Sequence, residues 1–206
     1  FSSGTTAKAK AIPLKHKHIV ANLMQVKHWI IPSLKQDREV IITALPLYHI
    51  FSLVANLLLM LNIGGENILI PNARDINSLI KVMKRYSFTC ITGVNTLFQA
   101  LLNHNHFSRC QFQRLTLSVG GGMAVNEKTA DEWQKATGCV ITQAYGMTEC
   151  SPAISVNTMD SIVFNGSVGL PLPNTLVSIR NEKGKTLAAN ESGEIWVKGP
   201  QVMDEY

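Results

Sequence analysis

Five consecutive residues, Tyr145-Gly-Met-Thr-Glu149, place an aromatic ring, a glycine, a hydroxyl and a carboxylate together. They follow the apolar run Cys139–Thr142, which predicts a buried strand, and open α/β sheets bind ligands beyond the carboxyl ends of their strands. Tyr145 offers a flat face for a base or ring, Gly146 allows a close approach of backbone, and Glu149 offers an oxygen ligand suited to Mg²⁺. The segment therefore indicates a ligand site at an exposed strand tip; an ordinary strand-to-loop turn is the alternative.

A second candidate lies among the first ten residues, where the small-residue loop Ser2-Ser-Gly-Thr-Thr6 is followed by Lys8 and Lys10. Backbone N–H groups, hydroxyls and lysines in such a loop can surround phosphate oxygens. The loop is not a Walker A motif, because that motif needs glycine where this chain has Ala9. From this stretch alone, a phosphate site and a flexible connector both stay open.

Two further segments bring small or polar residues to the ends of expected strands. Gly120-Gly-Gly122 follows the run Leu115–Val119, and Pro46-Leu-Tyr-His49 follows the run Val40–Leu45. His49 carries an imidazole into the start of an apolar helix. A histidine that only begins the helix is the alternative to a catalytic one.

The elements that would position these residues alternate along the chain. Apolar residues at three- and four-residue steps predict helices over residues 16–34, 50–63, 75–85, 95–102 and 126–136. Apolar, β-branched runs predict strands over residues 40–45, 66–70, 88–92, 115–119 and 139–142. Repeated strand-then-helix units of this kind predict an α/β fold, a mainly parallel sheet with helices on both faces.

After about residue 165 the pattern changes. Glycines and prolines interrupt the chain, and residues 176–179 and 194–197 indicate two strands around a polar loop. We therefore expect a smaller antiparallel β element after the parallel sheet, and divide the chain into residues 1–165 and 166–206.

The composition argues against two classes of protein. Of the 206 residues, 46% are hydrophobic and 16% charged, which describes a globular chain rather than a disordered one. The net charge is +5, yet the basic residues are scattered, without the basic stripe and interleaved aromatics of a nucleic-acid-binding protein. The densest basic cluster, residues 8–18, could meet phosphate or an anionic membrane surface; a solvated helix face is the alternative.

The four cysteines show neither CxxC nor Cys/His metal spacing, which favours free thiols in a reducing compartment such as the cytoplasm. The longest apolar run, Ile50–Ile63, is about 14 residues long, whereas a bilayer span takes roughly 20. We therefore expect this run to form a buried helix rather than a transmembrane one.

Three stretches, in this order, resemble the adenylate-forming superfamily of acyl-CoA synthetases, firefly luciferase and peptide-synthetase adenylation domains. They are Phe1–Lys10, Leu45–Phe51 and Tyr145–Glu149. Elsewhere the sequence is most similar to that of bacterial long-chain fatty acid–CoA ligases. The similar segments are Gly120-Gly-Gly-Met, Gly166-Ser-Val-Gly-Leu-Pro and Val197-Lys-Gly-Pro-Gln-Val-Met.

This resemblance implies a two-step reaction. ATP and a fatty acid give acyl-adenylate and pyrophosphate, and the thiol of coenzyme A then displaces AMP. Attack of one anion on the phosphorus of another is opposed electrostatically, so Mg²⁺ and N–H donors must neutralise the developing charge. The location implied is cytoplasmic, with peripheral contact to the inner membrane left open; the oligomeric state is not readable.

The resemblance also assigns residues. By it, the β- and γ-phosphates are held by Ser2, Ser3, Gly4, Thr5, Thr6 and Lys10. Gly121 and Gly122 line the adenine and acyl pockets, and Tyr145, next to Gly146, stacks on adenine. Thr148 touches the α-phosphate, Glu149 holds Mg²⁺, and His49 lies beside the reacting carboxylate.

The chain departs from the family pattern in its first loop, with Ala7 and Ala11 in place of glycine and Ala9 in place of proline. If position 7 needs a positive φ, alanine there costs about 1 kcal/mol. A degenerate or regulatory adenylate-binding module therefore stays open.

The family's ribose-binding aspartate, hinge and small C-terminal domain with its catalytic lysine would lie past Tyr206. We therefore expect a fragment of the large N-terminal domain of the adenylate-forming fold, not competent for turnover. In it, residues 1–165 would be part of the adenylate- and acyl-binding subdomain and residues 166–206 part of a β-rich subdomain. Acyl chain length, and coenzyme A against an acyl-carrier protein as acceptor, are not fixed by any residue.

Overall fold

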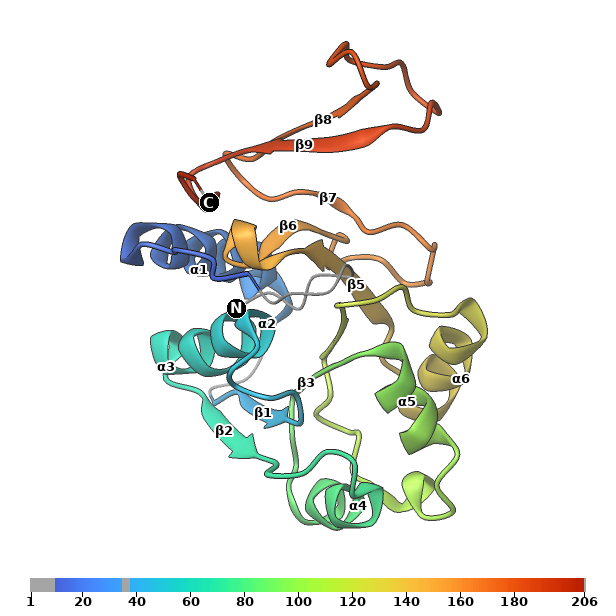
Figure 1. The fold of residues 1–206 in the computed structure, drawn as a ribbon. Helices are drawn as coiled ribbons and strands as arrows, with labels where there is room; N and C mark the ends of the chain where they lie inside the picture. The colour runs from blue at the N-terminus through green and yellow to red at the C-terminus, as the bar shows by residue number, and fades with distance from the viewer. Residues whose placement is uncertain (1–9, 35–37, 206) are drawn as a thin grey trace.

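A computed structural model describes residues 10–34 and 38–205, which form an α/β body with a protruding β-hairpin (Figure 1). The body contains a seven-stranded sheet in the order β2-β1-β3-β4-β5-β6-β7, and the hairpin is a separate two-stranded sheet. The strands of the body are β1 (Val40–Thr43), β2 (Glu66–Leu69), β3 (Cys90–Gly93), β4 (Leu117–Gly120), β5 (Ile141–Gly146), β6 (Ala153–Val156) and β7 (Leu170–Pro171). The hairpin consists of β8 (Leu176–Arg180) and β9 (Glu194–Lys198).

Neighbours from β2 to β5 pair in parallel, whereas β5–β6 and β6–β7 pair antiparallel. The main helices are α1 (His16–Ile30), α2 (Ile50–Ser52), α3 (Leu59–Ile63), α4 (Ile76–Arg85), α5 (Asn95–Leu102) and α6 (Glu127–Thr137). A π-helical segment, η2 (Leu53–Leu58), joins α2 to α3, and short 3₁₀ turns are η1 (Ile31–Ser33), η3 (Phe107–Arg109) and η4 (Thr148–Cys150).

Helices cover both faces of the sheet (Figure 1). One hydrophobic cluster joins α4, α5 and α6 to the sheet around the fully buried Phe98 and Trp133, whose rings meet edge to face at 4.8 Å. The other joins α1 and α3 to the opposite face through Val26, Ile30 and Met60. The predicted mainly parallel α/β fold with a small antiparallel element is confirmed.

Local signals explain where the helices begin and end. The carboxylate of Asp75 accepts from the N–H of Ser78 at 3.1 Å and begins α4, and the amide oxygen of Asn126 accepts from Lys128 N at 2.9 Å and begins α6. Gly138 ends α6 with a left-handed φ of 76°. These three boundaries agree with the sequence-based prediction.

The predicted strand 139–142 is too short, and this corrects the expected position of two site residues. Strand β5 continues to Gly146, so Tyr145 and Gly146 belong to the sheet and not to a loop. The extension is possible because β6, which the sequence pattern did not predict, folds back and pairs with Ala144 to Gly146. Pairing with one neighbouring strand thus overrides the turn signal of the glycine.

Strand β7 was also not predicted, and it joins the main sheet although it lies after residue 165. Beyond it, β8 and β9 pair over five residues each, as the two apolar runs indicated. The division of the chain at residue 165 stays a prediction. Within residues 10–34 and 38–205, every helix is too short or too polar to cross a membrane.

Candidate active site

The loops that follow β1, β4 and β5 lie at one edge of the sheet, because these strands run parallel and their carboxyl ends meet there. A cavity of about 760 Å³ opens at this edge and extends along the face of the sheet covered by α1, η2 and α3. Seven candidate residues line it: His49, Gly121, Gly122, Tyr145, Gly146, Thr148 and Glu149. Residues from three segments distant in sequence are therefore brought to one site.

The remaining candidates lie elsewhere. Lys10 is exposed, forms an isolated β-bridge and is not among the residues that line the cavity. The loop Ser2, Ser3, Gly4, Thr5 and Thr6 lies outside the described residues, as do Ala7 and Ala9.

The turn after β5 is shaped by a close approach of backbone. A Cβ on Gly146 would overlap the carbonyl oxygen of Pro152, and that oxygen accepts from the N–H of Met147 at 2.9 Å. The strand register shifts between Tyr145 and Gly146, an irregularity of the kind that bends a strand locally. Gly146 is therefore required by the fold of this turn.

Thr148 and Glu149 begin the short turn η4, and both are half-buried. The carbonyl oxygen of Glu149 accepts from Met203 N at 2.8 Å, so the segment after β9 holds this turn from outside. Glu149 is the one acidic residue among the described residues that line the cavity.

The glycines after β4 leave space for a ligand. A Cβ on Gly121 would lie 3.1 Å from Cε1 of Phe51 and 3.3 Å from the carbonyl oxygen of Ala144. Gly122 has a φ of 76°, which most side chains disfavour. The loop is held by Gln143 of β5, whose amide oxygen accepts from Val125 N at 3.0 Å.

His49 begins α2, and its Nδ1 accepts from the N–H of Phe51 at 3.3 Å. The ring is exposed at the cavity mouth. The structure therefore gives His49 the helix-starting position that was the alternative, and also places it where a substrate carboxylate could reach it.

The interior of the cavity is apolar. Its walls come from α1 and η2 on one side, with Val26, Ile30 and Val54, and from β1 and β4 on the other, with Ile41 and Leu117. Burial raises the pKa of the Cys90 thiol in the wall to about 12, so this thiol stays protonated and is no nucleophile at neutral pH. The arrangement suits an apolar chain whose polar end lies at the edge of the sheet.

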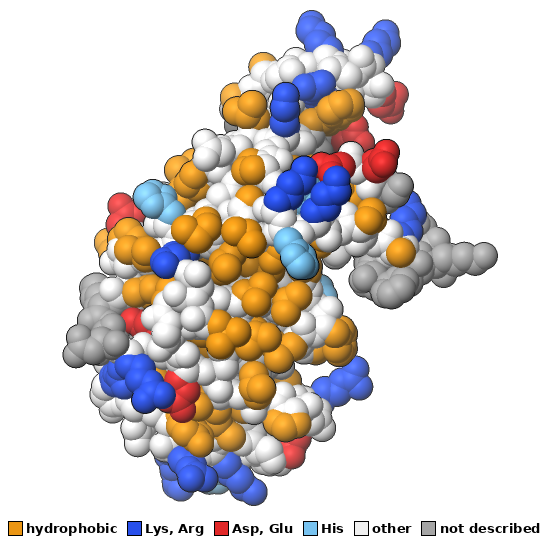
Figure 2. Space-filling model, turned by 90° about the vertical axis from the view of Figure 1, so that its left-hand side faces the viewer, with side chains coloured by type: hydrophobic (Ala, Val, Ile, Leu, Met, Phe, Trp, Pro, Cys, Tyr) orange, Lys and Arg blue, Asp and Glu red, His pale blue; other side chains and the backbone are white. Residues whose placement is uncertain are grey.

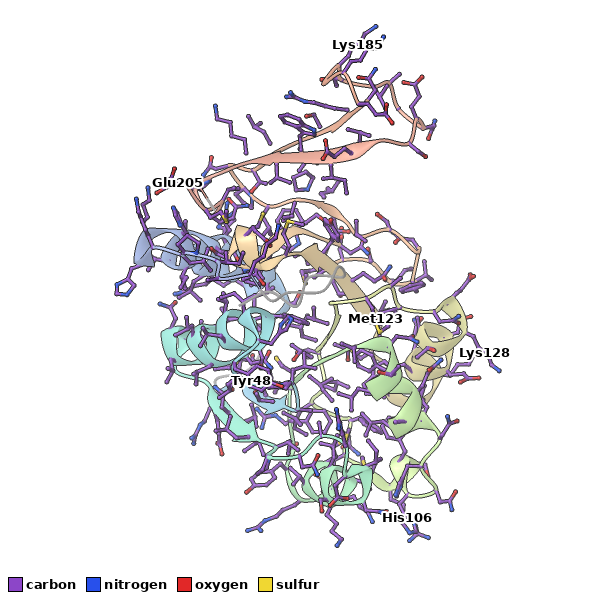
Figure 3. All side chains as sticks on the ribbon, in the orientation of Figure 1. Tyr48, His106, Met123, Lys128, Lys185 and Glu205 are labelled. Carbon is purple, nitrogen blue, oxygen red and sulfur yellow. The ribbon has the colours of Figure 1, made fainter. Side chains whose placement is uncertain are left out.

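Several lining residues were not among the predicted site residues. Tyr48, between β1 and α2, lines the cavity and is 91% exposed (Figure 3). Met123, in the loop between β4 and α6, follows the glycines but is not among the residues that line the cavity (Figure 3). Phe51, Thr92 and Met147 also line the cavity. Phe51 falls inside the resembling segment Leu45–Phe51, but no spacing rule singles out Thr92.

Among the described residues, no cluster of three or more histidine, cysteine or acidic side chains could hold a metal ion. Mg²⁺ in nucleotide enzymes is held by one or two carboxylates together with the substrate phosphates, and a single Glu149 beside the hydroxyl of Thr148 fits that pattern. The donor set therefore suits a metal that arrives with a phosphate ligand.

Comparison with known proteins agrees with this geometry. The family described as "AMP-binding enzyme" matches residues 1–206. A long-chain-fatty-acid–CoA ligase of Yersinia pestis is 47% identical over 206 residues, and one of Bacillus subtilis is 30% identical over 207 residues. Both alignments cover all of this chain but 37% of the relative, so the chain spans little more than a third of these proteins.

Among solved structures, ATP-bound MatB from Rhodopseudomonas palustris superimposes with a TM-score of 0.86 at 29% identity, covering 99% of this chain and 39% of that one. O-succinylbenzoate coenzyme A synthetase (MenE) from Bacillus subtilis, in complex with ATP and magnesium ion, gives a TM-score of 0.82 at 28% identity, covering 99% and 41%. Together with the family match over its whole length, these likenesses show that the chain belongs to the family of AMP-binding enzymes.

Proposed function

We propose that the protein carrying this chain is a long-chain fatty acid–CoA ligase. It activates a fatty acid with ATP and Mg²⁺ to an acyl-adenylate and transfers the acyl group to coenzyme A. The observation that carries the proposal is the cavity of about 760 Å³ that joins an apolar interior to a polar edge. The names of the relatives from Yersinia pestis and Bacillus subtilis support the choice of substrate.

The residues at the polar edge of the cavity bind the adenylate, and those of its apolar interior bind the acyl chain. At the edge, Tyr145 stacks on the adenine, and the hydroxyl of Thr148 donates a hydrogen bond to an α-phosphate oxygen. Glu149, together with the phosphates of ATP, would hold Mg²⁺, and the ion would supply positive charge to neutralise the charge that develops on the transferred group. His49 lies beside the fatty carboxylate and orients it, while the apolar walls hold the chain and exclude water.

The test uses the complete protein that carries this chain. We expect pyrophosphate exchange into ATP that depends on hexadecanoate, and acyl-CoA formation once coenzyme A is added. Glu149→Gln should lower the exchange rate by about 100-fold, since loss of one charge-stabilising group typically costs that much. Glu182→Gln, an exposed acid in the hairpin loop, is the matched control.

Absence of fatty-acid-dependent exchange in the wild-type protein would contradict the proposal and favour the degenerate or regulatory adenylate-binding module. The substitutions Ala7, Ala9 and Ala11 give that alternative its support. Exchange without acyl-CoA formation, restored by an acyl-carrier protein, would instead identify a ligase of the carrier-protein type.

For the isolated 206 residues we propose weak nucleotide binding without turnover. Relatives of this chain are longer, and a domain supplied in cis after this segment would complete the site. Acyl-CoA formation by the isolated chain at the rate of the complete protein would refute this part of the proposal.

We also propose a cytoplasmic protein whose contact with the inner membrane is peripheral. Figure 2 shows the face formed by α1, α3 and β2, where hydrophobic side chains gather between basic margins. Val20 and Met24 of α1 and Leu61 of α3 are about half or more exposed, at 54%, 50% and 66%. Sedimentation of the protein with anionic vesicles, weakened by Met24→Glu, is the expected result; equal sedimentation of the variant would contradict it.

A further inference from the structure

The helix that covers the cavity is not regular. Between α2 and α3 the six residues Leu53–Leu58 are π-helical, and the N–H of Leu59 reaches the carbonyl oxygen of Val54, five residues before it. Such widened turns are rare and occur mostly at functional sites. Three of the six residues, Leu53, Val54 and Ala55, line the cavity.

A buried polar side chain lies in the middle of this segment. Asn56 is fully buried, and its amide pairs in both directions with Thr92 of β3. Asn56 Nδ2 donates a hydrogen bond to Thr92 Oγ1 at 2.8 Å, and Thr92 Oγ1 donates one to Asn56 Oδ1 at 3.0 Å. The two side chains therefore satisfy each other's hydrogen-bonding groups in the interior of the protein.

Neighbouring hydrogen bonds connect Asn56 to further polar groups. Ser52 Oγ accepts from Asn56 Nδ2 at 3.3 Å and donates to the carbonyl oxygen of Leu45 at 2.8 Å. On the other side, Asn67 Nδ2 donates to the carbonyl oxygen of Asn56 at 3.5 Å. The cluster thus ties the π-helical segment to strands β2 and β3 and to the chain leaving β1.

Thr92 is itself part of the cavity wall, together with Cys90 and Ile91 of the same strand. The Asn56–Thr92 pair therefore joins the helical wall of the cavity to the wall formed by the sheet. Breaking one side of such a pair leaves a buried polar group without a partner, which is costly, so the distance between the walls is firmly fixed.

We propose that Asn56 and Thr92 are a positioning pair that determines acyl-chain preference by fixing the π-helical wall against β3. The inference rests on the proposed function of the cavity as the acyl site. Thr92 is one residue from the carboxyl end of β3, whereas Cys90 lies deeper. A chain that enters at the edge passes Thr92 first, and only a long chain reaches the deeper wall toward Cys90 and Met60.

The expected result concerns selectivity. With the complete protein, Thr92→Val should lower the ratio of kcat/KM for hexadecanoate to kcat/KM for octanoate by about tenfold, because a long chain contacts more of the displaced wall. The KM for ATP should stay within about twofold of the wild-type value, since the adenylate end of the cavity is held by other segments. Thr92→Ser, which keeps the hydroxyl, should restore the ratio.

Two further variants separate positioning from mere stability. Asn56→Leu/Thr92→Val replaces both partners by apolar groups and leaves no buried amide unpaired, so it should fold while the ratio remains as low as in Thr92→Val. Thr89→Val is the matched control: Thr89 is a fully buried threonine of the same segment, hydrogen-bonded to Val40 N at 3.0 Å, and it does not line the cavity.

Each outcome decides one question. A wild-type protein that activates fatty acids, with an unchanged hexadecanoate-to-octanoate ratio in Thr92→Val and in the double variant, overturns the inference and leaves the proposed function intact. An equal change of the ratio in Thr89→Val also overturns it. A wild-type protein that activates no fatty acid overturns the proposed function itself.

Discussion

Two single residues, Gly121 and Phe51, both line the cavity and meet at its wall. Gly121 has no side chain, and the ring of Phe51 occupies the adjoining space. The cavity at the edge of the sheet therefore depends on a glycine next to an aromatic ring. This contact joins two segments 70 positions apart in the sequence.

Gly121→Val should lower kcat/KM for the fatty acid at least about tenfold, because its methyl groups overpack the space beside Phe51. Adding Phe51→Leu should recover part of the loss by returning space. Steady-state kinetics of the complete protein measure this. Wild-type kinetics in Gly121→Val would show that the acyl group does not pass this point.

Cys90, which is 1% exposed in the cavity wall, gives a prediction about pH. Burial raises the pKa of its thiol to about 12, so the native thiol is protonated at pH 8.5, where an unfolded cysteine is about half ionised. Iodoacetamide at pH 8.5 should label Cys90 about 100-fold more slowly in the native protein than in guanidinium. Because the folded pKa is raised, the stability linked to this group is complete below pH 8.5 and is lost as the pH rises toward 12.

Mass spectrometry of the labelled peptide gives both rates. Equal rates in the native and unfolded protein would show that the wall around Cys90 opens readily.

The motifs Leu45–Phe51 and Tyr145–Glu149 could be found from the sequence because each is contiguous and carries its chemistry within a few residues. The partners of those motifs could not. Thr92 and Asn56 are ordinary residues of a strand and a helix, and only their packing across 36 positions brings them together.

At the level of elements, α1 is fixed to the segment after β9 by a group of charges. The carboxylate of Asp204 lies within ion-pair distance of Lys15, Lys17 and the buried His18. Hydrogen bonds from Lys15 and Lys17 lower the pKa of Asp204 to about 2. The neighbouring Met203 N–H holds the carbonyl oxygen of Glu149, so this contact also steadies the turn that carries a candidate catalytic residue.

Asp204→Asn should lower the melting temperature by about 2 °C at pH 6, since exposed ion pairs contribute little. A lowered folded pKa means that this stabilisation is present above about pH 4 and is lost as the pH falls toward 2. The difference in melting temperature between variant and wild type should therefore be smaller at pH 3 than at pH 6, and smaller in 1 M salt than at low salt.

Differential scanning calorimetry measures this difference, with the exposed Asp160→Asn as control. A difference in melting temperature that does not change with pH would show that the carboxylate charge of Asp204 contributes nothing to the stability of the fold.

The elements themselves illustrate which signals can be read from sequence. Helix α4 has both an N-cap in Asp75 and a clear apolar face, and its predicted bounds agree with the structure. Strands β6 and β7 are four and two residues long; β6 forms because it pairs with β5, and β7 because it pairs with β6, and no local pattern records either pairing. The π-helical turn over Leu53–Leu58 is equally invisible, because its apolar spacing is that of an ordinary helix.

At the scale of the whole molecule, the parallel order of β1 to β5 accounts for the position of the site. It brings the segments after β1, β4 and β5 to one edge, while α1, η2 and α3 enclose an apolar space beneath it. The alternation of strands and helices in the sequence was sufficient to predict this edge. The size of the space was not predictable, because it depends on how side chains pack from elements spread between α1 and β6.

The most direct test of the account is calorimetric titration of the complete protein with hexadecanoyl sulfamoyl-adenosine, a non-hydrolysable acyl-adenylate analogue, in the wild type and in Tyr145→Ala. We predict tight binding to the wild type, and a Kd raised roughly ten- to hundredfold in Tyr145→Ala through loss of stacking on adenine. Tyr86→Ala, a half-buried tyrosine that does not line the cavity, should bind as the wild type does. No binding to the wild type, or equal binding to Tyr145→Ala, would contradict the assignment of this cavity to an acyl-adenylate.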